Sequence, residues 1–352
     1  MAVDADGTQV YVAVFESGNQ TTILGGGIDG LGNDAFPPNV VNEAVGPYGG
    51  TNPPPNDGSG FTPVQNPSNP APPAVGLIVK NVDGVWLDDN GGDWTALVSG
   101  SSARLSGRRP GWRLVDRDMA IIDASNLSVS YATGLMNVCM SLAVNPGTGH
   151  VTVVGTDATN EVRYEPNLSG RFVRVNMATV NPSSPDDSPV VDLNPHLDYT
   201  VSTVPQDKRD ESVGDPRAVV WNSDGTRGYI SGMGSNNLIV IDPSGQRIGK
   251  ESTVEVGESP TGLALDEGRN RLCVINKFDA SISVVDIELE AEIERVSFFD
   301  PSPRAIKVGR KHLYDTHKNS ARTPAWGTSP VPRVTSIHGW TGSPGTSGIQ
   351  RD

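Results

Sequence analysis

PTGLALDEGRNRLCVINKFDASISVVDIELEAEIERVSFFDPS, residues 260–302, contains four short segments that are apolar or alternate in polarity. Apolar runs at Leu263–Leu265 and Leu272–Ile275 flank the polar turn DEGRNR, and a third run, ISVVD, ends at Asp286. Four short strands in a unit of roughly 40 to 50 residues are typical of one β-propeller blade. The stretch therefore predicts a four-stranded antiparallel sheet.

The residues before and after this stretch repeat its pattern. Residues 216–259 begin PRAVVWNSDGTRGYISG and contain the run LIVID, and PRAIKVGRKHLYDT begins the pattern again at Pro303. The prolines that open the three units, Pro216, Pro260 and Pro303, are 44 and 43 residues apart. Asp-Gly and Asn turns supply the positive φ that tight hairpins need. The period predicts successive blades.

Three earlier segments fit the same template. Residues 1–24 (MAVDADGTQVYVAVFESGNQTTIL) predict the first three strands of a blade, and residues 118–134 (DMAIIDASNLSVSYATG) predict a third and a fourth strand. Residues 139–166 predict the first three strands of the next blade. We therefore expect an all-β protein, an incomplete β-propeller of four-stranded blades, with roughly four to five blades present.

The expected propeller covers residues 1–320 and carries two long loop insertions. Residues 25–75 and 181–215 are rich in Gly, Pro, Asn or Ser and are too long for ordinary hairpins. Residues 321–352 are predicted to be an irregular tail because they show no strand-like alternation.

Charge and composition exclude several classes of partner. A formal charge of −14 and a pI near 4.8 argue against nucleic acid or an anionic membrane surface. No apolar run reaches 18 residues, so no membrane span is expected.

The start MAVDADGTQV contains no signal peptide, and we expect the original start to lie upstream. Cys139 and Cys273 lie in apolar runs, either as free core residues or as a pair.

The stretch LCVINKFDASISVVD resembles the YVTN-type propeller repeat. Asn276 falls on the Asn of that repeat and Asp286 on its terminal Asp. YISGMGSNNLIVID and VTVVGTDATNEVRY are looser copies, with Gly232 and Gly155 in place of the Asn. The resemblance implies a bacterial propeller protein and says little about chemistry.

A second resemblance lies near the end of the chain. GRKHLYDTHKNS, residues 309–320, resembles the junction at which the propeller of bacterial secreted proteins ends and a c-type cytochrome region begins. There a Cys-x-x-Cys-His motif binds haem covalently, whereas this chain has no such motif. TSPVPRVT, residues 328–335, can be encoded so that a displaced reading frame gives Lys-Pro-Cys-Ala-Ser-Cys-His. We therefore hypothesise that the tail is a frame-shifted start of a cytochrome c region, with covalent haem c in the intact protein and no cofactor in this chain.

Candidate binding residues come from three turns that should follow the second strand of a blade. These turns are FESGNQ (15–20), GTDATNE (155–161) and NKFDAS (276–281), and they are expected to line one common rim. The candidates are Glu16, Asn19, Asp157, Asn160, Glu161, Asn276, Lys277 and Asp279.

No catalytic residue and no metal-ligand spacing can be named from the sequence. WLDDNGGDW, residues 86–94, offers oxygen ligands for calcium, but it lacks the Glu at the twelfth position of an EF-hand loop and is better explained as a polar turn.

The resemblances imply an exported scaffold, periplasmic or secreted, that binds a ligand or partner and serves electron transfer. Its partner would be a redox protein or its own cytochrome c region, of the di-haem peroxidase or oxidase class. A lactonase-like hydrolase with acidic channel residues is one alternative, and a non-catalytic surface or adhesion protein is another. Whether the chain is an enzyme stays open, with a non-enzymatic role favoured.

Overall fold

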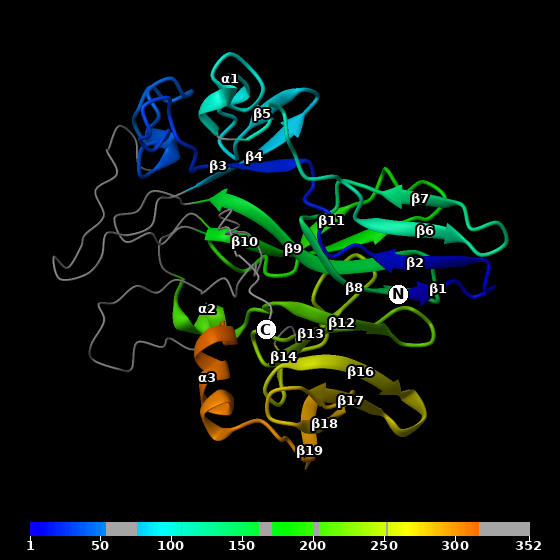
Figure 1. Ribbon diagram of the computed structural model, residues 1–352. Helices are drawn as coiled ribbons and strands as arrows, with labels where there is room; N and C mark the ends of the chain where they lie inside the picture. Colours follow the sequence, from blue (N-terminus) through cyan, green and yellow to red (C-terminus); the bar gives the residue numbers. More distant parts are fainter. Residues whose placement is uncertain (54–75, 107, 162–170, 200–203, 251–252, 317–352) are drawn as a thin grey trace, which may run out of the picture.

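The computed structural model describes residues 1–53, 76–106, 108–161, 171–199, 204–250 and 253–316 (Figure 1). It is an all-β structure with four four-stranded antiparallel sheets, one three-stranded sheet and a few short helices. We call the four-stranded sheets the first to fourth blades, in chain order. The architecture is propeller-like, as the repeat predicts. None of the described helices has the length and apolar character needed to cross a membrane.

The first blade is interrupted in the chain. Its strand order is β1-β2-β6-β7, and residues 14–118 lie between its second and third strands. The third strand predicted at TTIL is therefore wrong, because Thr21–Leu24 pairs with another sheet and residues 118–134 complete the blade. The N–H of Val14 donates to the carbonyl of Asp118 at 2.8 Å, where the chain leaves and re-enters. The strands are β1 Ala2–Val3, β2 Gln9–Ala13, β6 Met119–Asp123 and β7 Val129–Ala132.

Most of this interruption, from β3 to η2 (residues 21–106), forms a small unit with its own core, which we call the inserted module. The sheet β3-β4-β5 packs with short helices around Trp86 and Trp94, whose side chains are 1% and 0% exposed. The insertion predicted at 25–75 lies inside this longer segment. Its elements are β3 Thr21–Leu24, η1 Val40–Asn42, β4 Leu77–Val82, β5 Val85–Leu87, α1 Thr95–Val98 and η2 Ala103–Ser106.

The other three blades are continuous in the chain, and each has its four strands in sequence order. The predicted turns have the expected backbone: Gly225 and Asn270 adopt φ of 73° and 56°. The second blade contains β8 Val138–Val144, β9 Val151–Glu161, β10 Arg171–Val180 and β11 Val190–Asp192. The third contains β12 Pro216–Trp221, β13 Gly228–Gly232, β14 Asn237–Ile241 and β15 Val254–Glu255. The fourth contains β16 Pro260–Asp266, β17 Arg271–Asn276, β18 Ser281–Asp286 and β19 Ala291–Ser297.

The predicted insertion at 181–215 is only partly a connection. Strand β11 lies inside it and completes the second blade, and helix α2 (Gln206–Asp210) follows before the third blade. The sequence does not predict β11, because a strand of three residues is too short to show alternation and Pro, Ser and Asp surround it.

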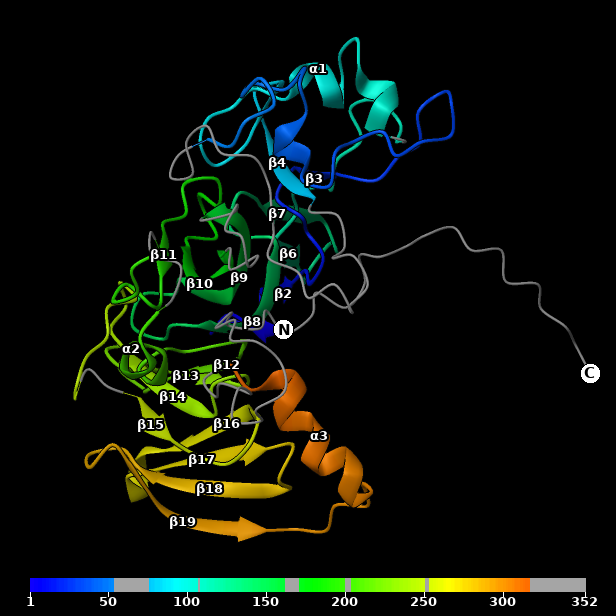
Figure 2. The same cartoon turned by 90° about the vertical axis from the view of Figure 1, so that its left-hand side faces the viewer.

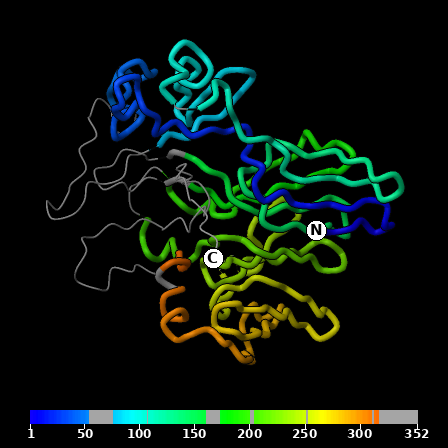
Figure 3. The backbone as a smooth tube through the Cα atoms, viewed as in Figure 1, coloured from blue at the N-terminus to red at the C-terminus, as the bar shows by residue number. Residues whose placement is uncertain are grey.

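The blades stack in chain order (Figure 2), and apolar faces meet between them. Separate buried clusters join the first to the second blade, the second to the third and the third to the fourth. Figure 3 follows the same course, from the first blade, with β1 and β2 in blue and β6 and β7 in blue-green, to the fourth blade in yellow and orange. Cys139 is buried and Cys273 partly exposed, and both are free. The pairing alternative is therefore wrong, and the core alternative fits Cys139.

A helix follows the fourth blade. The prediction that a new unit begins at Pro303 is wrong, because Arg304–Tyr314 form helix α3. The N–H groups of Ile306 and Lys307 donate to the carbonyl of Pro303 at 3.0 and 3.2 Å, and proline is well suited to the first turn of a helix. The run RAIKVGRKHLY lacks the period of two that a strand with one buried face requires.

Candidate functional site

The second strand of each blade ends on one side of the stack, and this side carries the predicted rim. Helix α3 lies on the same side, against loops of the third and fourth blades (Figure 1). We call this side the loop face.

Asn19 and Asp157, predicted from two different turns, are brought together where the first and second blades meet. Asp157 accepts a hydrogen bond from the N–H of Asn137 at 3.2 Å, and Asn137 also donates its side-chain amide to the carbonyl of Gly18 at 3.0 Å. Burial raises the pKa of Asp157, while the charge of Lys80 and the Asn19 side chain oppose this rise. Asn19 is 3% exposed and adopts φ of 48°. Both residues help to join the blades.

Asp118 lies close by and was not predicted. Its side chain is fully buried, and its Oδ2 accepts the N–H of Leu135 at 2.5 Å. Burial raises the pKa of Asp118 to about 6, and the charge of Asp116 adds to this. The sequence does hold a signal: in the repeat, Asp118 of DMAIID occupies the position of Asn237 in NLIVID and Ser281 in SISVVD.

The same carboxylates keep a neighbouring thiol in its neutral form. Cys139 is 1% exposed. Burial, and then the charges of Asp118 and Asp157, raise the pKa of its thiol. A thiol that stays protonated near neutral pH is a poor nucleophile, so Cys139 is a core residue.

Asn276 and Asp279 form a second group, within the fourth blade. Asn276 is fully buried, and its amide donates to Ser281 Oγ at 2.9 Å and to Ser283 Oγ at 2.7 Å. Asp279 accepts from Ser281 Oγ at 2.8 Å and from the N–H of Glu258 at 3.1 Å. Asn276 therefore braces β17 against β18 inside the blade, and Asp279 fixes the adjoining loop.

The other predicted rim residues are placed as follows. Glu16 and Lys277 are exposed on the loop face, on the first and the fourth blade. Asn160 and Glu161 end strand β9, and their side chains lie outside the described residues. FESGNQ and NKFDAS follow the second strands of their blades, as expected, whereas GTDATNE belongs to strand β9 rather than to a turn. A binding role for these residues stays a prediction.

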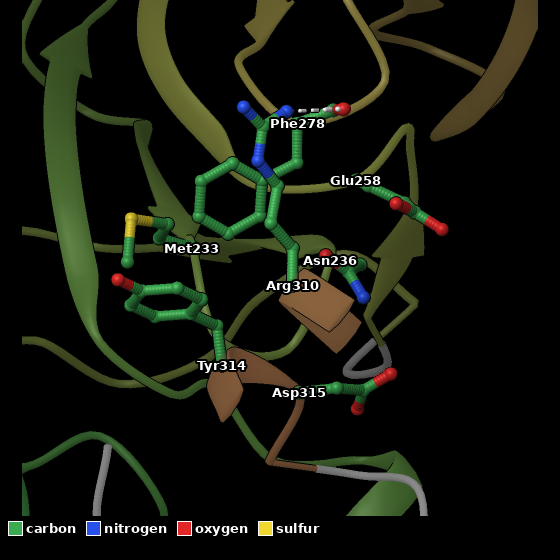
Figure 4. Close-up of a pocket in the computed structure, with 7 residues that line it drawn as sticks. All are labelled: Met233, Asn236, Glu258, Phe278, Arg310, Tyr314 and Asp315. Carbon is green, nitrogen blue, oxygen red and sulfur yellow. Dashed lines mark hydrogen bonds between the residues drawn. The ribbon is translucent and has the colours of Figure 1, made fainter. Parts of the chain in front are cut away.

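Helix α3 closes a shallow pocket on the loop face, with room for about one water molecule. Figure 4 shows its lining, in which Met233 and the Tyr314 ring lie on one side and Glu258 and Asn236 on the other. Arg310 donates to the carbonyl of Phe278 at 3.2 Å, and its guanidinium lies 5.2 Å from the Phe278 ring centroid. The rings of Phe278 and Tyr314 have centroids 4.9 Å apart. These contacts hold the helix in place.

The predicted turn at residues 86–94 is confirmed as a polar turn. Asp88 accepts hydrogen bonds from the backbone of Asn90 and Gly92 and from Trp94 Nε1, at 2.8 to 3.0 Å. Among the described residues, no group of three or more His, Cys, Asp or Glu side chains could hold a metal ion.

The residues of this chain do not fit covalent haem. Attachment requires two cysteines and a histidine in a Cys-x-x-Cys-His motif. The only two cysteines, Cys139 and Cys273, lie on different blades. A covalently attached c-type haem would therefore need the cysteines of another segment or another protein.

No family model and no curated protein matches this chain. Solved structures of β-propeller-like folds do match it, each at low similarity. A structure of a nidogen/laminin complex has 12% identity and a TM-score of 0.35, covering 53% of this chain and 57% of that one. Apo AztD from Citrobacter koseri has 14% identity and a TM-score of 0.32, covering 53% and 44%. A functionally unknown protein from Desulfotomaculum acetoxidans has 11% identity and a TM-score of 0.35, covering 52% and 50%. The chain therefore spans about half the length of the structures it matches, and similarities this low support no statement about function.

Proposed function

We propose that this chain is a propeller-type scaffold whose loop face binds a partner, and that the partner carries redox chemistry as a c-type cytochrome region or a separate redox protein. The observation that carries the proposal is the position of helix α3. The helix contains GRKHLY, residues 309–314 of the motif that resembles a propeller–cytochrome junction, and it packs on the loop face. The N–H of Thr316 donates to the carbonyl of Gly234 at 2.8 Å, so the chain beyond Thr316 starts at this face.

The chemistry of the described residues supports a binding role more than catalysis. The buried polar side chains of the two groups are engaged in hydrogen bonds that hold loops and strands; they are Asn137 and Asp157 between the first and second blades, and Asn276 and Asp279 in the fourth blade. The groups exposed on the loop face, Glu16 among them, could recognise a partner by charge. Rim charges of this kind steer association and select partners more than they add affinity. A basic partner would complement the formal charge of −14.

The first prediction tests this surface with a purified basic c-type cytochrome as the probe. The double variant Glu16→Gln/Glu258→Gln removes two charges from the loop face, and we expect it to raise the Kd by about three- to tenfold at low salt. Isothermal titration calorimetry measures the change. Asp6→Asn/Glu288→Gln, which removes the same charge from exposed positions in the β1–β2 turn and after β18, at the ends of the blades opposite the loop face, serves as the matched control and should change the Kd less than twofold.

Equal weakening by the two double variants would show that only net charge matters, and would contradict a loop-face site. Binding to cell-wall or matrix material without any binding to the cytochrome would favour the adhesion alternative instead.

A lactonase-like hydrolase is a second candidate because carboxylates do converge between the first and second blades. Asp116, Asp118 and Asp157 are close enough to shift the pKa of Cys139 together, and burial raises the pKa of Asp118 to about 6, a value suited to acid–base work. Lactone hydrolysis that is lost in Asp118→Asn, with the fold retained, would favour this candidate over the scaffold.

A further inference from the structure

The first and fourth blades each turn one sheet face away from the rest of the stack. Between neighbouring blades, the facing sides of both sheets are apolar; for example, Leu238 and Val240 of the third blade pack against Leu272 and Val274 of the fourth. Because side chains alternate along a strand, every blade has a second face. Among the described residues, no blade neighbours that face of the fourth blade or the corresponding face of the first blade. We call them the two end faces.

The end face of the fourth blade is an aliphatic surface that crosses all four strands. The strand register places Gly262, Ile275, Ile282 and Val296 in one row. Ile275, Ile282 and Val296 are 44%, 36% and 50% exposed. The next row on this face contains Ala264, Cys273, Val284 and Glu294.

The end face of the first blade has the same character. Its register aligns Val3, Val10, Ile122 and Val129 across the four strands. Val3 and Val129 are 50% and 48% exposed. The adjacent row contains Val12, Ala120 and Tyr131.

The repeat shows what each end face lacks. Ile282 occupies the position that Leu238 occupies one unit earlier, yet Leu238 is 1% exposed because the fourth blade covers it. In the same way, Ile122 occupies the position of Ile241, which is fully buried against the second blade. The fourth blade thus presents the side that a following blade covers, and the first blade presents the side that a preceding blade covers. The two end faces are the two halves of one interface type.

We propose that two copies of this chain associate through these faces, with the fourth blade of each copy packed on the first blade of the other. A second copy is the occupant that the molecule itself indicates, because it supplies both missing halves at once and continues the three blade-to-blade interfaces already present. Two stacks of four blades form a ring of eight, within the usual range of about four to eight blades. A two-fold rotation closes such a ring, which buries the exposed aliphatic rows.

The second prediction tests this association by light scattering after size-exclusion chromatography, over a range of protein concentrations. The full chain, with a mass of 37.1 kDa, should elute with the mass of two copies. Ile282→Asp on the fourth blade and Val129→Asp on the first blade each place a carboxylate in an apolar interface. We expect either variant to raise the dissociation constant about tenfold or more. Val296→Asp, on the edge strand β19, replaces Ile282→Asp if that variant does not fold.

A mixture of the two variants distinguishes head-to-tail association from other dimers. Each variant retains the end face that the other has lost, so the mixture should recover pairs held by one interface. Leu31→Asp, at an 88% exposed position of the inserted module, is the control and should leave the mass unchanged.

Three outcomes would overturn the proposal. The mass of a single chain at every concentration would show that the chain does not self-associate, and would mean that further blades or another protein cover the end faces. A dimer that persists in both variants, or one that only a single variant abolishes, would place the interface elsewhere or make it symmetric. Circular dichroism of each variant separates loss of association from loss of folding.

Discussion

The residue that opens the third strand of a blade has a recurring structural role. Asn237 donates its side-chain amide to the carbonyl of Ser212 at 2.9 Å, and Ser281 donates to Asp279 at 2.8 Å. Asp118 occupies the same position and accepts the N–H of Leu135. All three are buried, but only Asp118 can ionise. The side chain at this position is therefore neutral in the third and fourth blades and titratable in the first blade.

This difference gives a pH dependence, our third prediction. Because burial raises the pKa of Asp118 in the folded chain to about 6, above the ordinary value of 3.8 for an exposed aspartate, the native chain binds this proton more tightly than the unfolded chain. Asp118 therefore lowers stability as pH rises from about 4 through about 6, by up to about 3 kcal/mol. Asp118→Asn should lack this loss, so its melting temperature should fall less than that of the wild type across this range in scanning calorimetry.

Asp6→Asn, in the exposed turn between β1 and β2, is the control for the loss of one negative charge. It should keep the pH dependence of the wild type. An Asp118→Asn variant with the wild-type slope would show that this carboxyl does not titrate in that range.

Among the elements, helix α3 depends on one arginine. Arg310 bonds to the carbonyl of Phe278, to Ser302 Oγ at 2.7 Å and to Asp300 at 3.4 Å. The backbone N–H of Ser302, and then the Ser302 hydroxyl and Lys307, hold the pKa of Asp300 down at about 2. The helix is therefore fastened to the fourth blade mainly by polar contacts at its preceding loop.

The fourth prediction follows from this attachment. Arg310→Ala removes all three bonds and the contact with the Phe278 ring, so α3 should open more often from the loop face. Hydrogen exchange in Arg304–Tyr314 should become about tenfold faster or more. The exposed Arg304→Ala, at the start of the helix, is the matched control and should leave exchange close to that of the wild type. Unchanged exchange in Arg310→Ala would mean that other contacts hold the helix.

At the scale of the whole molecule, the inserted module and the blade stack have separate cores. The buried cluster around Trp86 and Trp94 contains residues of the module only, and the three other clusters belong to the blades. Each part therefore buries its own apolar surface, and one can lose stability without the other.

The fifth prediction concerns this separation. Trp94→Leu leaves a cavity in the module and removes the Nε1 bond to Asp88, at a cost of about 3 kcal/mol or more. Hydrogen exchange should accelerate in β3, β4 and α1 but stay unchanged in β12 to β19. Ile230→Ala, in the fully buried core between the second and third blades, should give the opposite pattern. Acceleration of both regions by both variants would show a single cooperative unit.

Local patterns in the sequence were enough to predict the regular part of the fold. Apolar runs with Asp-Gly or Asn turns, spaced by 44 residues, predict the strands of the third and fourth blades because alternation and turn chemistry act within a few residues. The same reasoning failed at TTIL and at Pro303. A strand-like run of four residues does not specify its pairing partner, and a repeated proline does not distinguish a strand from the first turn of a helix.

Contacts between distant residues decided the remaining features. Asn19 meets Asp157 at the point where the chain leaves the first blade, and Asp118 is buried among residues that include Ser17 and Leu135, which are distant from it in sequence. The sequence alone determined that this chain forms four-stranded blades of one repeat. The tertiary structure decided which faces of those blades are covered, because the burial of a face depends on the neighbouring blade. The apolar character of a face depends only on the alternation of residues within each strand, which the sequence shows.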